Sequence, residues 1–67
     1  MRERLERLIE EMVDRGILFE DAVAAFERTF ITTVLARADG NLSEAARHLR
    51  IHRNTLSRKV ADLKVKR

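Results

Sequence analysis

Residues 40–60 read GNLSEAARHLRIHRNTLSRKV, and this stretch decides the fold. Asn41 is a residue type favoured at helix N-caps, and Glu44 lies three positions further along the chain. That spacing is typical of a capping box, and it predicts a helix of barely two turns that starts after Asn41. The apolar side of this helix is formed by Leu42, Ala45, Ala46 and Leu49.

A second short helix is expected after a break at residues 50–52. Its apolar positions recur at i, i+4 and i+7, which predicts an amphipathic helix over residues 53–63. These positions are Leu56, Val60 and Leu63. Two short helices joined by a tight turn, the second of them basic, are typical of a helix-turn-helix that binds DNA. Ala45 and Ala46 suit a close crossing of the two helices, and Ile51 is expected to fill the core at the turn.

Two longer helices are predicted ahead of this stretch. The first covers about residues 2–15 and ends at Gly16, because glycine readily takes the left-handed backbone that terminates a helix. Its apolar face is formed by Leu5, Leu8, Ile9, Met12 and Val13. The second covers about residues 19–38 and ends at Gly40 for the same reason.

The helix over residues 19–38 carries two apolar strips. The first strip consists of Phe19, Ala22, Val23, Phe26, Phe30 and Val34. The second strip consists of Ala24, Ile31, Leu35 and Ala38. Together they cover more of the circumference than a helix packed on one side needs. We therefore expect this helix to be covered from two directions.

A chain of 67 residues forms one small domain, and such domains usually need a stabilising device in addition to their small core. The sequence has no cysteine for disulfides, so oligomerisation is the remaining common device. We predict an all-α, intertwined homodimer in which residues 1–39 dimerise and residues 40–67 form the helix-turn-helix. The predicted dimer interface consists of Leu5, Leu8, Ile9, Met12, Phe19, Val23, Phe26, Phe30 and Val34.

Charge is divided unevenly between the two halves of the chain. Residues 1–39 hold six arginines against nine acidic residues, a net charge of −3. Residues 40–67 hold eight lysines and arginines against two acidic residues, a net charge of +6. The basic half favours double-stranded DNA as partner, although charge alone would serve solubility equally well.

Other classes of function find little support in the sequence. No phosphate-binding loop, nucleophile–base pair or paired carboxylates stand out, so we predict no enzyme activity, no cofactor and no small-molecule ligand. His48 and His52 alone do not make a metal site, and His48 is expected on the surface with no carboxylate placed to use it. No apolar run suits a signal peptide or a membrane span, so a cytoplasmic, nucleoid-associated protein is expected.

The last predicted helix carries the candidate DNA contacts. His52 and Arg53 stand at its N-terminal end, where a recognition helix first reaches the bases, and Ser57 lies on the outer side. An arginine can donate two hydrogen bonds to guanine. His52 can equally cap the helix. Residues suited to phosphates or to the groove edge are Asn54, Thr55, Arg58, Lys59, Lys64, Lys66 and Arg67.

The stretch over residues 40–63 resembles the helix-turn-helix of the Fis family. In the family outline, Gly-Asn is followed after three residues by Ala-Ala, and after two more residues by Leu-Gly-Ile. One residue later comes Arg, and one residue after that comes Thr-Leu, followed by a basic pair and an apolar residue. The preceding helices match the family's dimerisation pair, and the module is similar to the C-terminal domain of NtrC-type sigma-54-dependent activators. The resemblance implies that Arg53 is the principal base-reading residue and that the dimer bends DNA. It also implies groove-edge or backbone contacts from Asn41, Ser43, Thr55, Arg58 and Lys59.

The sequence departs from the family outline at several points. Arg50 replaces the turn glycine of LGI, which typically costs about 1–2 kcal/mol, while its charge can contact a phosphate. Ser57 stands where Fis itself carries a longer basic residue. Fis itself carries a flexible N-terminal arm that engages recombinases; here a helix is predicted almost at once, so recombination-enhancer activity is not expected.

Two readings from other classes stay open. One is a dimeric adaptor whose basic half binds an acidic protein, and the other is a detached output domain of a regulator. Mobility shifts with random duplex competitor at several salt concentrations separate the adaptor from a DNA-binding protein.

Overall fold

The computed structural model describes residues 1–65 and contains four helices over that range. They are α1 (Arg2–Asp14), α2 (Phe19–Arg37), α3 (Leu42–Leu49) and α4 (Arg53–Asp62). The described part of the chain holds no β-strand. The predicted all-α fold with four helices is therefore confirmed, and each helix end lies within about a residue of the predicted one.

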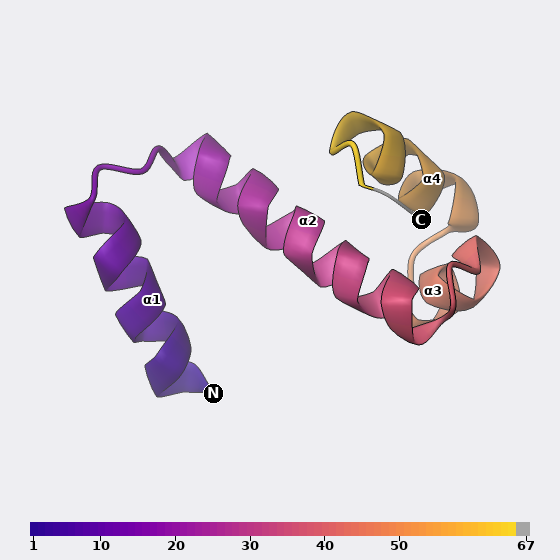
Figure 1. The fold of residues 1–67 in the computed structure, drawn as a ribbon, viewed down its shortest axis with the longest axis horizontal. Helices are drawn as coiled ribbons and strands as arrows, with labels where there is room; N and C mark the ends of the chain where they lie inside the picture. Colours follow the sequence, from indigo (N-terminus) through magenta and orange to yellow (C-terminus); the bar gives the residue numbers. More distant parts are fainter. Residues whose placement is uncertain (66–67) are drawn as a thin grey trace.

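The long helix α2 joins two parts of the molecule (Figure 1). At one end α1 leaves it at an angle, and at the other end α3 and α4 pack together beside it (Figure 1). The turn between α1 and α2 includes Gly16, whose φ of 74° is the left-handed conformation that glycine adopts readily. No residue of α1 is buried. Within a single chain, α1 thus takes no part in the core.

The core lies where the C-terminal half of α2 meets α3 and α4. Ala45 and Leu56 are both fully buried, so the small Ala45 lets the two short helices cross closely. The buried cluster consists of Ile31, Leu35, Ala38, Leu42, Ala45, Ala46, Leu56 and Val65. Partly buried side chains around it are Val34, Leu49, Ile51, Val60 and Leu63. The helix-turn-helix therefore covers most of the second apolar strip of α2.

The first apolar strip of α2 remains largely exposed on the single chain. Phe19 is 82% exposed, Phe26 59% and Phe30 50%. The rings of Phe26 and Phe30 lie 5.5 Å apart between centroids. Together with the apolar face of α1 they line a groove between α1 and α2. We expected α2 to be covered from two directions; within the single chain it is covered from one, by the helix-turn-helix.

All four helices end in the same hydrogen-bonded motif. In each, a left-handed residue ends the helix, and the amide after that residue donates to the carbonyl five residues back, as in a Schellman motif. Examples are Ile51 N to Ala46 O at 3.1 Å and Val65 N to Val60 O at 3.0 Å. The left-handed residues are Gly16, Asp39, Arg50 and Lys64. The motif folds Ile51 and Val65 back onto the core.

The left-handed conformation of Arg50 leads to a stability prediction. Its φ of 57° and ψ of 42° are conformations in which a Cβ atom is unfavourable. We expect Arg50→Gly to raise the free energy of unfolding by about 0.5–1 kcal/mol, because the relief of strain exceeds the added chain entropy of glycine. Urea unfolding followed by circular dichroism measures this change. Arg50→Ala is the matched control, since it removes the charge and keeps the Cβ atom; equal stability of the two variants would contradict the prediction.

Candidate nucleic-acid interface

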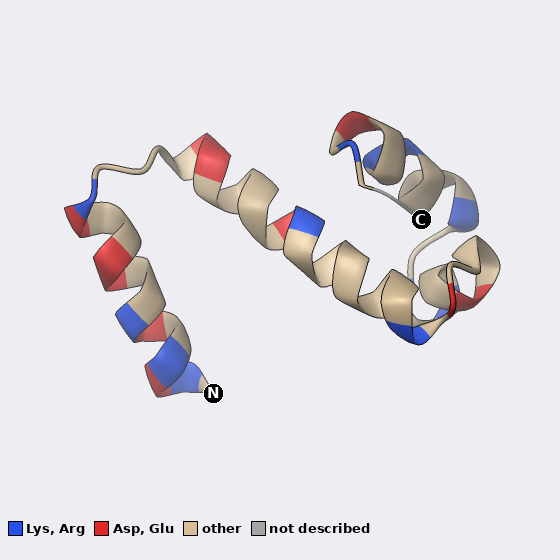
Figure 2. Ribbon diagram, in the orientation of Figure 1, with Lys and Arg blue, Asp and Glu red and all other residues tan. Residues whose placement is uncertain are grey.

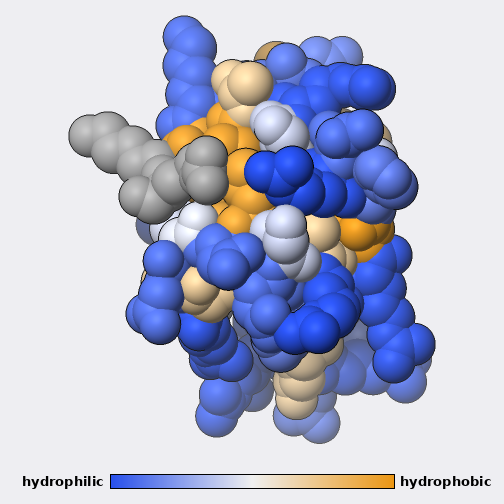
Figure 3. Space-filling view, turned by 90° about the vertical axis from the view of Figure 1, so that its right-hand side faces the viewer, coloured by the Kyte–Doolittle hydropathy of each residue, from blue (hydrophilic) through white to orange (hydrophobic). Residues whose placement is uncertain are grey.

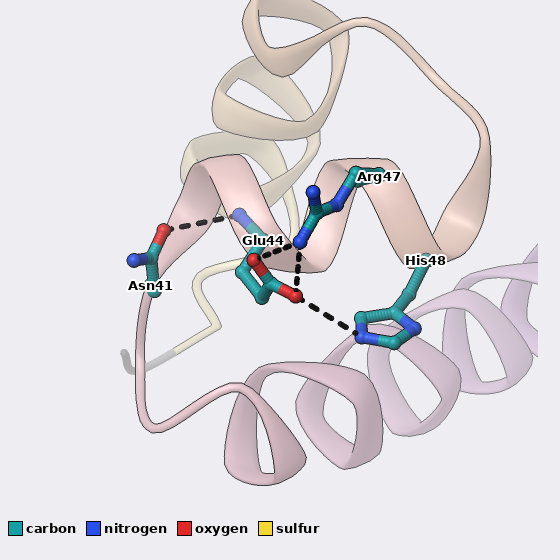
Figure 4. A network of polar contacts seen from close by, with 4 residues as sticks. All are labelled: Asn41, Glu44, Arg47 and His48. Carbon is teal, nitrogen blue, oxygen red and sulfur yellow. Dashed lines mark hydrogen bonds and ion pairs between the residues drawn. The ribbon is translucent and has the colours of Figure 1, made fainter.

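Asn41 caps α3 as predicted, although the capping box is only half formed. Its Oδ1 accepts a hydrogen bond from the backbone amide of Glu44 at 3.0 Å (Figure 4). The Glu44 side chain does not return the bond, since the amide of Asn41 donates to the carbonyl of Ala38 at 3.0 Å. The α2–α3 turn thus already satisfies the donor that a capping box would use, and the Glu44 carboxylate is free to bind elsewhere.

The carboxylate of Glu44 contacts the side chains of Arg47 and His48 on the outside of α3 (Figure 4). Arg47 Nη2 donates to both oxygens, at 2.6 Å from Oε1, and His48 Nε2 lies 3.5 Å from Oε1. The hydrogen bond from Arg47, and then its charge, lower the pKa of Glu44, while the same contact raises the pKa of Arg47. His48 is exposed as expected, but the expectation that no carboxylate lies near it was wrong. The reason is the i, i+4 spacing, which brings Glu44 to its side.

His52 caps the start of α4. Its Nδ1 accepts a hydrogen bond from the backbone amide of Asn54 at 3.0 Å, so Nδ1 carries no proton in this arrangement. The capping role, one of the two roles considered for His52, is therefore present. The ring is exposed, and its Nε2 remains able to donate to a DNA acceptor.

The outer face of α4 brings the predicted contact residues together. Leu56 turns inward and is fully buried, whereas the residues before and after it in the sequence are exposed. The exposed set consists of Arg53, Asn54, Thr55, Ser57 and Arg58. The side of the molecule that carries α3 and α4 is largely hydrophilic (Figure 3). A helix that is apolar only inward and polar outward is what insertion into a DNA groove requires.

Further predicted contacts flank α4. Asn41, Ser43 and Arg50 are exposed around α3, at its start and in the turn that follows it. Lys64 is exposed and left-handed just after α4. The predicted phosphate contacts Lys66 and Arg67 lie outside the described residues.

Lys59 stands apart from the other candidates because it faces α2. Its Nζ lies 3.2 Å from Oε1 and 3.4 Å from Oε2 of Glu27, and the two side chains are 39% and 35% exposed. Beside this pair, Arg28 Nε donates to the carbonyl oxygen of Leu63 at 3.0 Å. Sequence reasoning missed both contacts, because the residues are more than thirty positions apart and no local spacing connects them.

The residues predicted to form a dimer interface lie on one open surface. Most of them are exposed, for example Leu8 at 53% and Phe26 at 59%, while Met12 and Val34 are partly buried. They all line the groove between α1 and α2. The structure therefore brings these residues together and leaves their apolar atoms in contact with solvent.

Searches for two other kinds of site were negative. Residues 1–65 contain no group of three or more histidine, cysteine, aspartate or glutamate side chains that could hold a metal ion. Within the same described part of the chain, none of the helices has the length and apolarity needed to cross a membrane.

Comparison with known proteins places this arrangement in a family. A family model described as "Bacterial regulatory protein, Fis family" matches residues 22–63, which run from the first turn of α2 to the end of α4. Neither the comparison with curated proteins nor that with solved structures found a significant match. The matched part of the chain is a regulatory helix-turn-helix that binds DNA. The chain belongs to the Fis family of bacterial regulatory proteins.

Proposed function

We propose that the protein acts as a homodimer that binds duplex DNA with a sequence preference and inserts α4 of each protomer into the major groove. The observation that carries this proposal is that α4 has one side buried in the core and another side exposed. Leu56 is fully buried against the core, while Arg53 and Arg58 are exposed on the outside. A basic helix held by its apolar side on a second short helix is the recognition element of this class of domain.

Each exposed side chain receives a role from its chemistry. Arg53, in the first turn of α4, is assigned to guanine O6 and N7, which accept its two parallel hydrogen bonds. His52 through Nε2, and Ser57, add single contacts to base edges. Contacts to phosphates or to the groove edge are assigned to Asn41, Ser43, Arg50, Asn54, Thr55, Arg58 and Lys64.

The proposed partner of the α1–α2 groove is a second copy of this chain. The groove is apolar, and no residue of α1 is buried in the single chain. An isolated helix of 13 residues is marginal in water, so α1 needs a cover over its apolar face. Two copies can cover each other's first α2 strip by the same contacts, which is the self-complementary form of a two-fold dimer.

A two-fold dimer presents two copies of α4 to one side of the DNA, which suits a degenerate inverted repeat. The family resemblance favours recognition helices closer together than one turn of DNA, and hence a bent duplex whose groove shape contributes to recognition. We propose this binding role, on nucleoid DNA, without a catalytic step.

Two measurements on the wild-type protein test the proposal. Sedimentation at micromolar concentration is expected to show a dimer, and a sedimenting monomer would refute the dimeric arrangement. Titration with duplex DNA against random competitor, at several salt concentrations, is expected to show binding. The logarithm of the association constant should fall linearly with the logarithm of the salt concentration. Absence of binding at near-physiological salt would refute the role of α4.

A further inference from the structure

We propose that Glu27 withholds Lys59 from DNA, and so limits the part of the affinity that does not depend on sequence. In this arrangement Arg58, the neighbour of Lys59, contacts phosphate, while Lys59 positions the recognition helix against α2. The inference rests on the proposed insertion of α4 into the groove. It assigns Glu27 a role in the strength and salt dependence of DNA binding, although Glu27 lies outside the helix-turn-helix.

The two cations at adjacent positions point to different sides of α4. Lys59 lies three residues after the fully buried Leu56 and therefore on the same side of the helix, whereas Arg58 lies two residues after it and on the opposite side. Lys59 Nζ is 3.2 Å from Glu27 Oε1. With its side chain 39% exposed, the lysine lies at the edge of the outer face, and without Glu27 its flexible stem could swing toward the DNA.

A second contact beside this ion pair holds α4 in place. Arg28 Nε donates to the backbone carbonyl of Leu63 at 3.0 Å, where the negative end of the α4 dipole attracts a cation. An acidic and a basic segment lie next to each other in the middle of α2 (Figure 2). Two adjacent residues of α2 thus contact α4 at positions one helical turn apart, Lys59 and Leu63.

The ion pair changes what Lys59 can contribute to DNA binding. A lysine that neutralises a phosphate releases a counterion, and each such contact adds about 0.9 to the slope of log affinity against log salt. A lysine already paired with a half-buried carboxylate adds nothing to that slope. If Lys59 moved away from Glu27 to a phosphate, the Glu27 carboxylate would remain at the α2–α4 contact without its partner. Phosphate contacts carry no sequence information, so withholding one lowers the affinity for every duplex alike and weakens binding to random DNA.

The test compares salt slopes on a random duplex for four variants of the full chain. Glu27→Gln is expected to steepen the slope by about 0.9 per protomer, or about 1.8 for the dimer, which is a roughly twelvefold larger loss of affinity between 50 and 200 mM salt than in the wild type. Lys59→Met is expected to leave the slope unchanged. The double variant Glu27→Gln with Lys59→Met should also leave it unchanged, because neither protein has a lysine at position 59 that could bind a phosphate. Lys59→Arg retains the pair and should also match the wild type.

Two controls separate this inference from the proposed function and from general charge effects. Glu20→Gln removes the same charge from α2 at a site that forms no ion pair within residues 1–65, and it should leave the slope unchanged. Arg58→Met should flatten the slope by about 0.9 per protomer, or about 1.8 for the dimer. If Arg58→Met has no effect, the proposed use of α4 fails. If Arg58→Met flattens the slope and Lys59→Met flattens it equally, or if Glu27→Gln behaves as Glu20→Gln does, the role of Glu27 is overturned.

Discussion

Arg53→Ala is expected to abolish the preference for the best duplex site while leaving the fold and the dimer intact. The bidentate contact of an arginine with guanine contributes about 1–3 kcal/mol of discrimination, and the two-fold dimer would lose it at both half-sites. Affinity for the specific site should therefore fall by roughly tenfold or more per half-site, whereas affinity for random DNA falls only slightly. Competition binding with specific and random duplexes measures both.

The matched control for this variant is Arg47→Ala. Arg47 is also an exposed arginine of the helix-turn-helix, but its guanidinium is paired with Glu44 on the outside of α3. It should change the specificity ratio by less than twofold, since paired surface cations contribute little. Unaltered specificity in the Arg53 variant, with circular dichroism and sedimentation both unchanged, would show that another residue reads the bases.

Phe26→Asp is expected to convert the protein to a monomer. Phe26 lies in the middle of the first apolar strip of α2, 59% exposed on the single chain and next to Phe30. In the proposed dimer this ring is covered by the partner, and loss of a buried phenylalanine typically costs about 3–5 kcal/mol before the burial of a carboxylate is counted. At about 1.4 kcal/mol per tenfold, the dimerisation constant should fall by more than a hundredfold.

Sedimentation at micromolar concentration measures this change, and DNA binding should weaken with it because the two recognition helices are no longer linked. Phe26→Leu keeps an apolar side chain and serves as the control that remains dimeric. A Phe26→Asp protein that still sediments as a dimer would place the interface elsewhere on the chain.

Much of this architecture can be predicted from local sequence. The N-cap at Asn41, the spacing of apolar residues along each helix and the glycine after α1 are signals that act over a few residues, and they define the helix bounds. The left-handed conformation at Arg50 is implied by the family resemblance and not by local sequence, because the family outline places the turn glycine at this position. The exposed outer face of α4 follows from the inward spacing of Leu56, Val60 and Leu63.

What local sequence could not predict depends on how the helices cross. The contact of Lys59 with Glu27 joins residues on two helices, so only the packed core decides that this cation faces α2 while Arg58 faces outward. Val65 is only 8% exposed because the end of α4 folds back, and no periodic pattern includes a residue beyond the helix. Glu44 departs from the expected capping box because the amide of Asn41 already donates to the carbonyl of Ala38, and its carboxylate binds Arg47.

The absence of any buried residue in α1 has a physiological consequence in the proposed dimer. Ordering of the N-terminal segment is then coupled to association, so dilution both separates the protomers and melts α1. Occupancy of an operator would rise with about the square of the protein level at low abundance. A modest change in expression would thereby be converted into a sharper change in the genes that the protein controls.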